Sequence, residues 1–130
     1  IKNNKIKNDK YLLSEFLFNH RKKEHDKKTI STSFYDRSMI DVIAYLNYWK
    51  ITYPIDWNRI IKKSNYTKKI FYTPVWKDIY KKTNTRLESY DESKIIDHFL
   101  KKTYLDFKYT LIKVPKVNIN ERVNFIIENI

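Results

Sequence analysis

Two stretches in the first half of the chain carry apolar residues at the spacing of a helix face. The first runs from Lys10 to Arg21, and the second runs from Asp36 or Ser38, either of which can cap a helix, to Lys50. The apolar stripe of the second stretch consists of Met39, Ile43, Leu46 and Trp49. We therefore expect two helices, and because the second stripe is the most apolar in the chain we assign that helix to the core.

Prolines mark the starts of two helices in the middle of the chain. Pro54 predicts a helix that ends near Ser64 or Asn65, because proline suits the first turn of a helix. Pro74 predicts a second helix, which continues to Asn84. Between them, Lys68 to Tyr72 does not distinguish a helix from a strand.

Two further helices are marked by a Ser or Asn followed three residues later by Glu, the pattern of a capping box. Ser89 and Glu92 precede an apolar stripe that continues to Leu100. Asn118 and Glu121 precede a second stripe that continues to the end of the chain. We expect an amphipathic helix after each pair.

From Tyr104 to Val114 apolar and polar residues alternate, which predicts a half-buried strand. One strand alone is not stable, so it requires a partner. The internal candidate is Thr29 to Tyr35, which is rich in β-branched and hydroxyl residues. Because that segment buries little apolar surface, we expect another chain or RNA to cover part of the strand.

Together these elements predict a mainly α fold, a small helical domain of roughly five to six helices with a minor two-stranded β element. A chain of 130 residues suits one core, so we expect a single helical domain over residues 11–130. Residues 1–10 are nearly all Lys, Asn and Ile without an amphipathic period, which predicts a basic N-terminal arm.

A short pattern occurs twice in the middle of the chain. Trp57 and Trp76 open the two copies, and each is followed by an Ile three positions later and then by a pair of lysines. Helical spacing places each Trp on the same face as its Ile, so we assign both rings to the core. The lysine pairs then lie near the C-terminal end of each helix, exposed to solvent.

The spacing of the two tryptophans, with the Ile and lysines after Trp57, resembles the middle of a Myb or SANT repeat. The resemblance covers residues 36–80 and implies a three-helix core held by the tryptophans, with the last helix in the major groove of DNA. The chain departs from the family pattern in lacking a Trp at the start of the first helix and in having few acidic residues there. Pro74 also falls inside the implied recognition helix, where proline costs about 3 kcal/mol.

The chain is strongly basic, with a formal net charge of +12, and aromatic residues make up 16% of it. A phosphate backbone or another anionic surface is the natural counter-charge, since an unpartnered excess of one sign repels itself. The abundance of Ile, Lys, Asn and Tyr is also typical of an AT-rich genome, so mutational bias contributes part of the excess. The chain opens with Ile1 and not Met, which we interpret as a processed or partial product.

The sequence offers little catalytic or metal chemistry. It contains no glycine and no cysteine, which excludes a Gly-rich phosphate loop, a nucleophile elbow, disulfides and thiolate metal sites within these residues. His20 and His25 do not share a helix face, so we interpret their charged run as a solvated basic loop. Asp91 and Glu92 fall in the first turn of a helix, where they compensate its dipole. We therefore expect no enzyme activity, no cofactor and no bound metal.

Basic residues and tyrosines alternate between the repeated pattern and the next capped helix. Lysines that reach phosphates beside rings that stack on bases are the pattern expected of a nucleic-acid-binding surface, and a solvated basic face is the alternative. The residues that we assign to this surface are Lys62, Lys63, Tyr66, Lys68, Lys69, Tyr72, Lys77, Lys81, Lys82, Arg86, Lys101 and Lys102.

High basicity without a catalytic set favours a non-catalytic, RNA-binding structural subunit of a large ribonucleoprotein. The leading case is a ribosomal protein, mitochondrial or of another organelle with an AT-rich genome. A Myb/SANT-like DNA-binding module and an accessory scaffold subunit of a protein complex are the alternatives. The expected partners are nucleic acid, RNA before DNA, and other protein subunits. No apolar run is long enough to span a membrane, and we expect an intracellular location.

Overall fold

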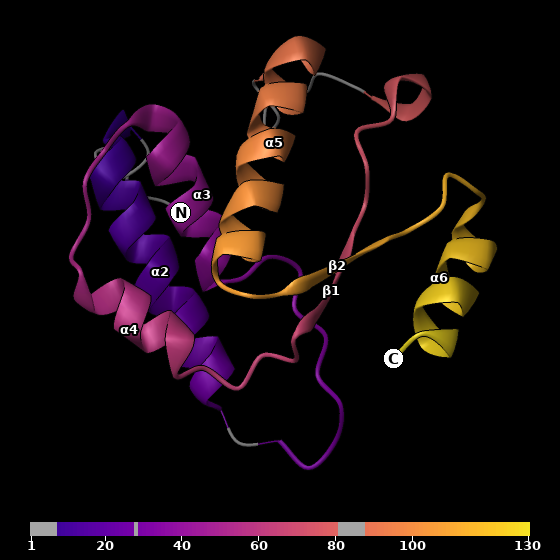
Figure 1. The fold of residues 1–130 in the computed structure, drawn as a ribbon, viewed down its shortest axis with the longest axis horizontal. Helices are drawn as coiled ribbons and strands as arrows, with labels where there is room; N and C mark the ends of the chain where they lie inside the picture. The colour runs from indigo at the N-terminus through magenta and orange to yellow at the C-terminus, as the bar shows by residue number, and fades with distance from the viewer. Residues whose placement is uncertain (1–7, 28, 81–87) are drawn as a thin grey trace. The chain divides into compact units, whose positions relative to one another are not determined.

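In the computed structural model the chain divides into two compact units, Ile1–Tyr66 and Thr67–Ile130. The structure describes residues 8–27, 29–80 and 88–130. Over these residues the fold has 5 α-helices, a short 3₁₀ helix and a two-stranded parallel sheet (Figure 1). The predicted class, mainly α with a minor β element, is confirmed. Most of the predicted basic arm, residues 1–7, lies outside the described residues.

The first unit is a helical unit built around one central helix. Its elements are α2 (Lys10–Asp26), α3 (Met39–Trp49) and α4 (Asp56–Lys62). α2 packs against α3, and α3 is buried along most of its length, which confirms the assignment of this helix to the core. The large side chains that are fully buried in this unit are Phe18, Met39, Ile40, Ile43, Leu46 and Ile61.

α2 continues beyond Arg21 to Asp26, through the charged run that we expected to form a loop. Lysine and carboxylate side chains pair along these turns. Lys22 lies 2.7 Å from Asp26, and Lys27 lies 2.8 Å from Glu24. Pairs at these spacings stabilise a helix, so the charges that suggested a loop extend the helix instead.

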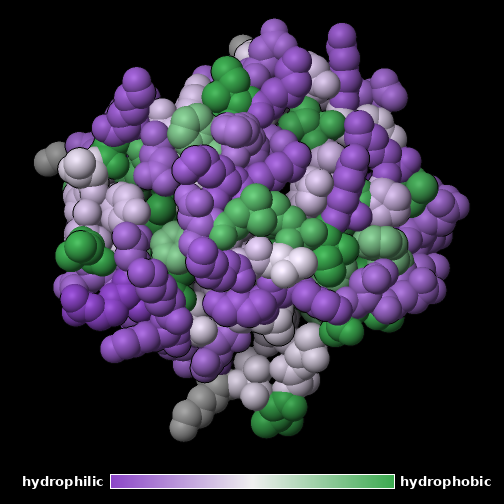
Figure 2. Space-filling view, in the orientation of Figure 1, coloured by the Kyte–Doolittle hydropathy of each residue, from purple (hydrophilic) through white to green (hydrophobic). Residues whose placement is uncertain are grey.

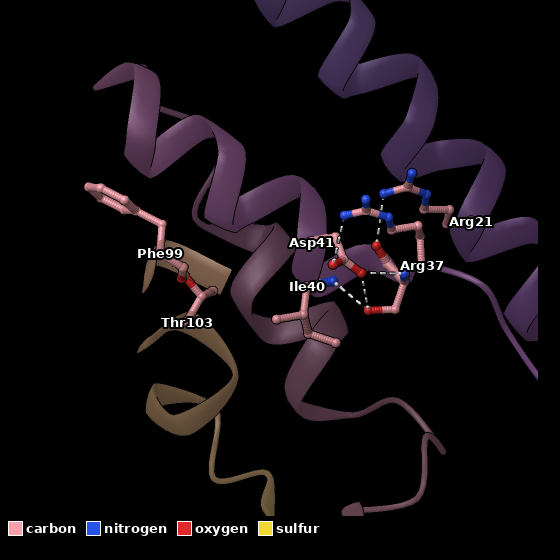
Figure 3. A network of polar contacts seen from close by, with 7 residues as sticks. Arg21, Arg37, Ile40, Asp41, Phe99 and Thr103 are labelled. Carbon is pink, nitrogen blue, oxygen red and sulfur yellow. Dashed lines mark hydrogen bonds and ion pairs between the residues drawn. The ribbon is translucent and has the colours of Figure 1, made fainter. Parts of the chain in front are cut away.

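A polar network fixes the start of α3 (Figure 3). The Ser38 hydroxyl accepts from the Ile40 N–H at 3.1 Å, and the Asp41 carboxylate accepts from the Ser38 N–H at 2.7 Å, which completes a capping box. Arg21 of α2 donates to the Ser38 carbonyl at 3.1 Å, and Arg37 lies 3.8 Å from Asp41. The network therefore ties α2 to the capped end of α3.

The second unit contains a parallel β-α-β arrangement followed by a helix. Its elements are β1 (Lys69–Tyr72), the 3₁₀ helix η1 (Lys77–Ile79), α5 (Tyr90–Asp106), β2 (Thr110–Lys113) and α6 (Ile119–Glu128). β1 and β2 are parallel, with Lys69 opposite Thr110 and Tyr72 opposite Lys113. Parallel strands require a long crossover connection, and the connection here contains α5, which packs against β2.

β2 is shorter than the predicted strand and pairs with a different segment. Leu105 lies in α5 and Phe107 at the end of that helix, so the regular alternation there belongs to a helix end and not to a strand. The partner of β2 is Lys69–Tyr72, the stretch whose sequence did not distinguish helix from strand. The predicted partner, residues 29–35, forms neither helix nor strand. Strand pairing joins distant segments, and local alternation does not determine it.

Over residues 73–80, the described part of the second tryptophan copy, the predicted α-helix does not form. Trp76 is extended, with φ −130° and ψ 103°, and only the 3₁₀ helix at 77–79 follows it. Pro74 disfavours a helical conformation at Thr73, and β1 ends immediately before Thr73. The recognition helix implied by the Myb/SANT resemblance is thus missing from residues 73–80, and residues 81–84 lie outside the described part of the chain. Over the described residues 76–80 the sequence repeat is therefore not a structural repeat.

The two capping predictions after residue 88 are confirmed. The Ser89 hydroxyl accepts from the Glu92 N–H at 3.1 Å, and the Asn118 side chain accepts from the Glu121 N–H at 2.9 Å. α5 and α6 begin directly after these residues. None of the described helices combines the length and the apolar character needed to cross a membrane.

Candidate nucleic-acid interface

Lys62 and Lys63 lie at the C-terminal end of α4, and both side chains are exposed. Cations are favoured there because the last carbonyl oxygens of a helix carry partial negative charge. Arg59 of the same helix pairs with Asp56 at 3.2 Å. In the part of the chain that the structure describes, neither lysine makes such an ion pair. Both charges are therefore available to an external anion.

Tyr66, assigned from the sequence to base stacking, packs in an aromatic cluster of the first unit. Its ring centroid lies 4.6 Å from that of His25 and 5.5 Å from that of Tyr35, both in edge-to-face geometry. His25 Nε2 accepts from the Asn65 N–H at 2.9 Å, so the ring proton sits on Nδ1 and is donated to Asp26. These contacts fix the chain after Lys63 against the end of α2.

In the second unit, two of the predicted lysines lie over tyrosine rings. Lys68 Nζ is 4.3 Å from the Tyr109 ring centroid, and Lys101 Nζ is 4.9 Å from that of Tyr72. Lys101 also pairs with Asp97 at 2.9 Å, and this hydrogen bond raises the pKa of Lys101 above its ordinary value. Tyr109 is buried and Tyr72 is half-buried beneath Lys101. Each ring thus already stacks against a side chain of the protein.

The remaining predicted lysines of this unit are exposed but differ in their neighbours. Lys69 Nζ donates to the Asn129 carbonyl at 3.3 Å, and Lys77 Nζ lies 5.8 Å from the Tyr90 ring centroid. Lys102 pairs with Asp106 at 3.1 Å. An exposed ion pair contributes about 1 kcal/mol or less, so a phosphate can replace Asp106 at little cost. Three further predicted residues, Lys81, Lys82 and Arg86, lie outside the described residues.

Three lysines that we did not single out in the sequence lie at the same sheet. Lys108, Lys113 and Lys116 flank or belong to β2, and all three are exposed. In the sequence they stand within or beside the predicted strand. Only the pairing of β2 with β1 shows that they flank the same sheet as Lys68 and Lys69, and no local pattern carries that information.

On the face drawn in Figure 2 hydrophilic residues predominate, with apolar ones exposed in small groups.

The acidic and histidine residues noted in the sequence contact neighbouring side chains. Asp91 pairs with Lys94 at 3.3 Å, and His98 lies edge-to-face with Phe99, 6.0 Å between centroids. His20 stacks beside Phe16 on α2. Over residues 8–27, 29–80 and 88–130, no group of three His, Cys, Asp or Glu side chains is arranged to hold a metal ion.

The fold is a mainly helical one with a parallel strand pair joined through a helix. The family model for the AAA domain matches residues 2–122, and the chain belongs to that family. No curated protein and no solved structure shows significant similarity to the chain. The AAA family groups P-loop-type nucleotide hydrolases, which weighs against the expectation of a protein without enzyme activity.

The residues of this chain do not fit a P-loop nucleotide site. A P-loop binds phosphates with the backbone N–H groups of a Gly-rich turn between a strand and a helix, and the 130 residues contain no glycine. β1 leads into an extended stretch with Pro74 and then into η1, which is only a 3₁₀ turn. The family match is therefore not accompanied by a phosphate-binding loop in this stretch of sequence.

Proposed function

We propose that the chain binds RNA through exposed lysines and serves as a structural subunit of a large ribonucleoprotein. The observation that supports this most directly is a set of exposed lysines without a carboxylate partner among the described residues, in a chain of net charge +12. These lysines are Lys62, Lys63, Lys68, Lys69 and Lys77. Lysines that exchange counterions for phosphates are the main source of affinity for nucleic acid.

The neighbours of the tyrosines favour contact with the phosphate backbone over stacking on bases. Tyr72 and Tyr109 lie under lysine side chains, and Tyr66 lies against His25 and Tyr35. A surface of this kind reads the shape and charge of a folded RNA and not its base sequence. Structured RNA is accordingly the proposed ligand.

A salt titration tests the proposal. Binding of the whole chain to a structured RNA and to a DNA duplex is measured by fluorescence anisotropy over a range of ionic strength. We expect tighter binding to the RNA and a linear fall of log affinity with log salt concentration. A clear sequence preference on the duplex would instead support the Myb/SANT-like alternative, and no binding to either would support an accessory scaffold subunit.

The lysines at the end of α4 offer a matched pair of variants. Lys62→Gln with Lys63→Gln should reduce the salt slope by roughly 0.7 to 0.9 for each lost phosphate contact. The control, Lys94→Gln with Asp91→Asn, removes an exposed ion pair outside the assigned surface at unchanged net charge and should leave the slope near that of the parent. Equal effects of the two double variants would contradict the assignment of Lys62 and Lys63.

The narrower proposal is a ribosomal protein, mitochondrial or of another organelle with an AT-rich genome. It derives from the basic composition and the small set of abundant residue types. Sedimentation with ribosomal particles at moderate salt, and release at high salt, is the expected behaviour. Sedimentation with free RNA but not with particles would restrict the function to RNA binding.

The AAA family match supports a second candidate, nucleotide hydrolysis. A protein of this family is expected to bind ATP, whereas this chain lacks the glycines of a P-loop. ATP binding measured by calorimetry and ATP hydrolysis measured by phosphate release separate the two candidates. Measurable hydrolysis by the purified chain would overturn the non-catalytic role.

A further inference from the structure

Among the described residues, no strand pairs with the outer edge of β2. The N–H groups of Thr110 and Val114 donate to the Lys68 and Tyr72 carbonyls of β1, at 2.7 and 2.9 Å. Backbone groups alternate in direction along a strand, so those of Leu111, between these donors, point away from β1. The backbone groups of Lys113, two residues further along the strand, also point away from β1. Among the described residues these outward groups have no hydrogen-bond partner.

The sheet itself is incomplete by the usual standards of parallel strands. Parallel sheets are normally covered on both faces and contain more than two strands, because a pair of strands buries little surface. The four apolar side chains at its centre remain half-buried, and they are Ile70, Phe71, Leu111 and Ile112. A further strand beside β2 would satisfy the outward groups and bury more of these side chains.

The lysines around this edge determine which kind of segment can pair with it. Lys108, Lys113 and Lys116 are exposed along and beside β2, and in the described part of the chain none of them makes an ion pair. Edge lysines oppose pairing between two copies of the same strand, because like charges would face each other across the new ladder. They favour a segment that carries acidic residues.

We propose that the free edge of β2 binds an extended segment of another protein, in which β-branched apolar residues alternate with acidic ones. The segment adds a strand by backbone hydrogen bonds to Leu111 and Lys113, and its carboxylates face the lysines beside the edge. The proposed partner binds β2, whereas the variants that test RNA binding lie in α4 at Lys62 and Lys63, so either proposal can fail while the other holds.

A blocked peptide of alternating Val and Glu is the probe, with binding to the whole chain measured by fluorescence anisotropy. We expect binding, with slower hydrogen exchange at the Leu111 and Lys113 amides. The control peptide has the same sequence and charge but an N-methyl group on every residue, which removes the donors of both of its edges. It should bind at least about tenfold more weakly. Equal binding of both peptides would show simple charge attraction and overturn the proposal, as would no binding of the first.

Leu111→Pro tests the protein side of the same ladder. It removes an outward N–H while leaving the inward donors Thr110 and Val114 in place, and proline is tolerated on such an edge. The variant should keep the circular dichroism of the parent and lose about tenfold in peptide affinity. A folded variant with unchanged affinity would refute the site. If the variant does not fold, the comparison of the two peptides on the parent chain tests the proposal instead.

Ultracentrifugation tests whether a second copy of the chain occupies this edge. A parent chain that dimerises, while Leu111→Pro is monomeric, would replace the partner by a second copy and overturn the proposal.

Discussion

Lys50 and Lys108 occupy the left-handed backbone region at the ends of α3 and α5, with φ of 57° and 68°. Both positions close a Schellman motif. The Ile51 N–H donates to the Leu46 carbonyl at 2.9 Å, and the Tyr109 N–H donates to the Tyr104 carbonyl at 3.1 Å. Glycine normally fills this position, but the chain has none, so lysines adopt a conformation that costs about 1 kcal/mol.

Lys50→Gly and Lys108→Gly should each raise the free energy of unfolding, by about 1 kcal/mol, because the strained backbone is relieved. Urea unfolding followed by circular dichroism measures the change. Lys63→Gly is the matched control, since Lys63 has an ordinary helical conformation with φ −88° and should lose stability on the same substitution. Equal changes at all three sites would show that backbone conformation is not the cause.

Trp57 is the aromatic centre of the first unit. It is 7% exposed, and its ring stacks on Phe18 with centroids 4.2 Å apart. Trp57→Ala should cost roughly 3 to 5 kcal/mol through lost burial and the resulting cavity. Trp76 is half-buried on an extended stretch beside Arg122, so Trp76→Ala should reduce the free energy of unfolding clearly less. Thermal unfolding of the two variants checks this order, and a larger loss at Trp76 would contradict the core assignment of Trp57.

At the scale of elements, α5 depends on its N-terminal cap. The Ser89 hydroxyl accepts from the Glu92 N–H, and Asp91 and Glu92 follow in the first turn. Ser89→Ala should lower stability by about 1 kcal/mol because a donor at the helix start loses its partner. Ser93, whose hydroxyl donates to the Ser89 carbonyl within the helix, provides the control. Ser93→Ala should be neutral or slightly stabilising, because alanine favours a helix interior. Similar losses in both variants would mean that the cap is not the source.

The elements that the sequence predicts are those whose signals are local. Ser38, Ser89 and Asn118 each begin a helix because the capping side chain and its partner N–H lie within three residues. The partner of β2 lies about forty residues away across α5, and no feature within either strand identifies the other strand as its partner. The same holds for the candidate interface. Exposure of Lys62 follows from a helix face, whereas the seating of Lys68 over Tyr109 follows only from the paired strands.

The whole molecule carries more positive charge than its acidic groups can balance. Ion pairs along α2 and α5, including Lys22 with Asp26 and Lys101 with Asp97, place carboxylates beside some of the lysines, but the net charge of +12 remains after all acidic groups are counted. The remaining lysines repel one another, and this repulsion opposes a compact state. A salt that screens the charges should therefore stabilise the chain against unfolding even without a nucleic-acid ligand.

Acidification should amplify this repulsion and unfold the chain. A hydrogen bond from Lys22, and then one from His25, lowers the pKa of Asp26, and a hydrogen bond from Lys27 lowers that of Glu24. Both carboxylates therefore favour the folded state above their ordinary pKa of about 4, and this contribution is lost as the pH falls through their lowered folded values. The net charge rises above +12 over the same range.

We expect the thermal unfolding temperature to decrease once the pH drops below about 4 at low salt. The decrease should be smaller at high salt, where the extra positive charge is screened. Circular dichroism during acid titration at two ionic strengths measures both effects. Asp26→Asn is the informative variant because it removes one of the lowered carboxylates, so its stability should vary less with pH than that of the parent. An acid transition that is independent of salt would show that charge repulsion does not limit the stability of this basic chain.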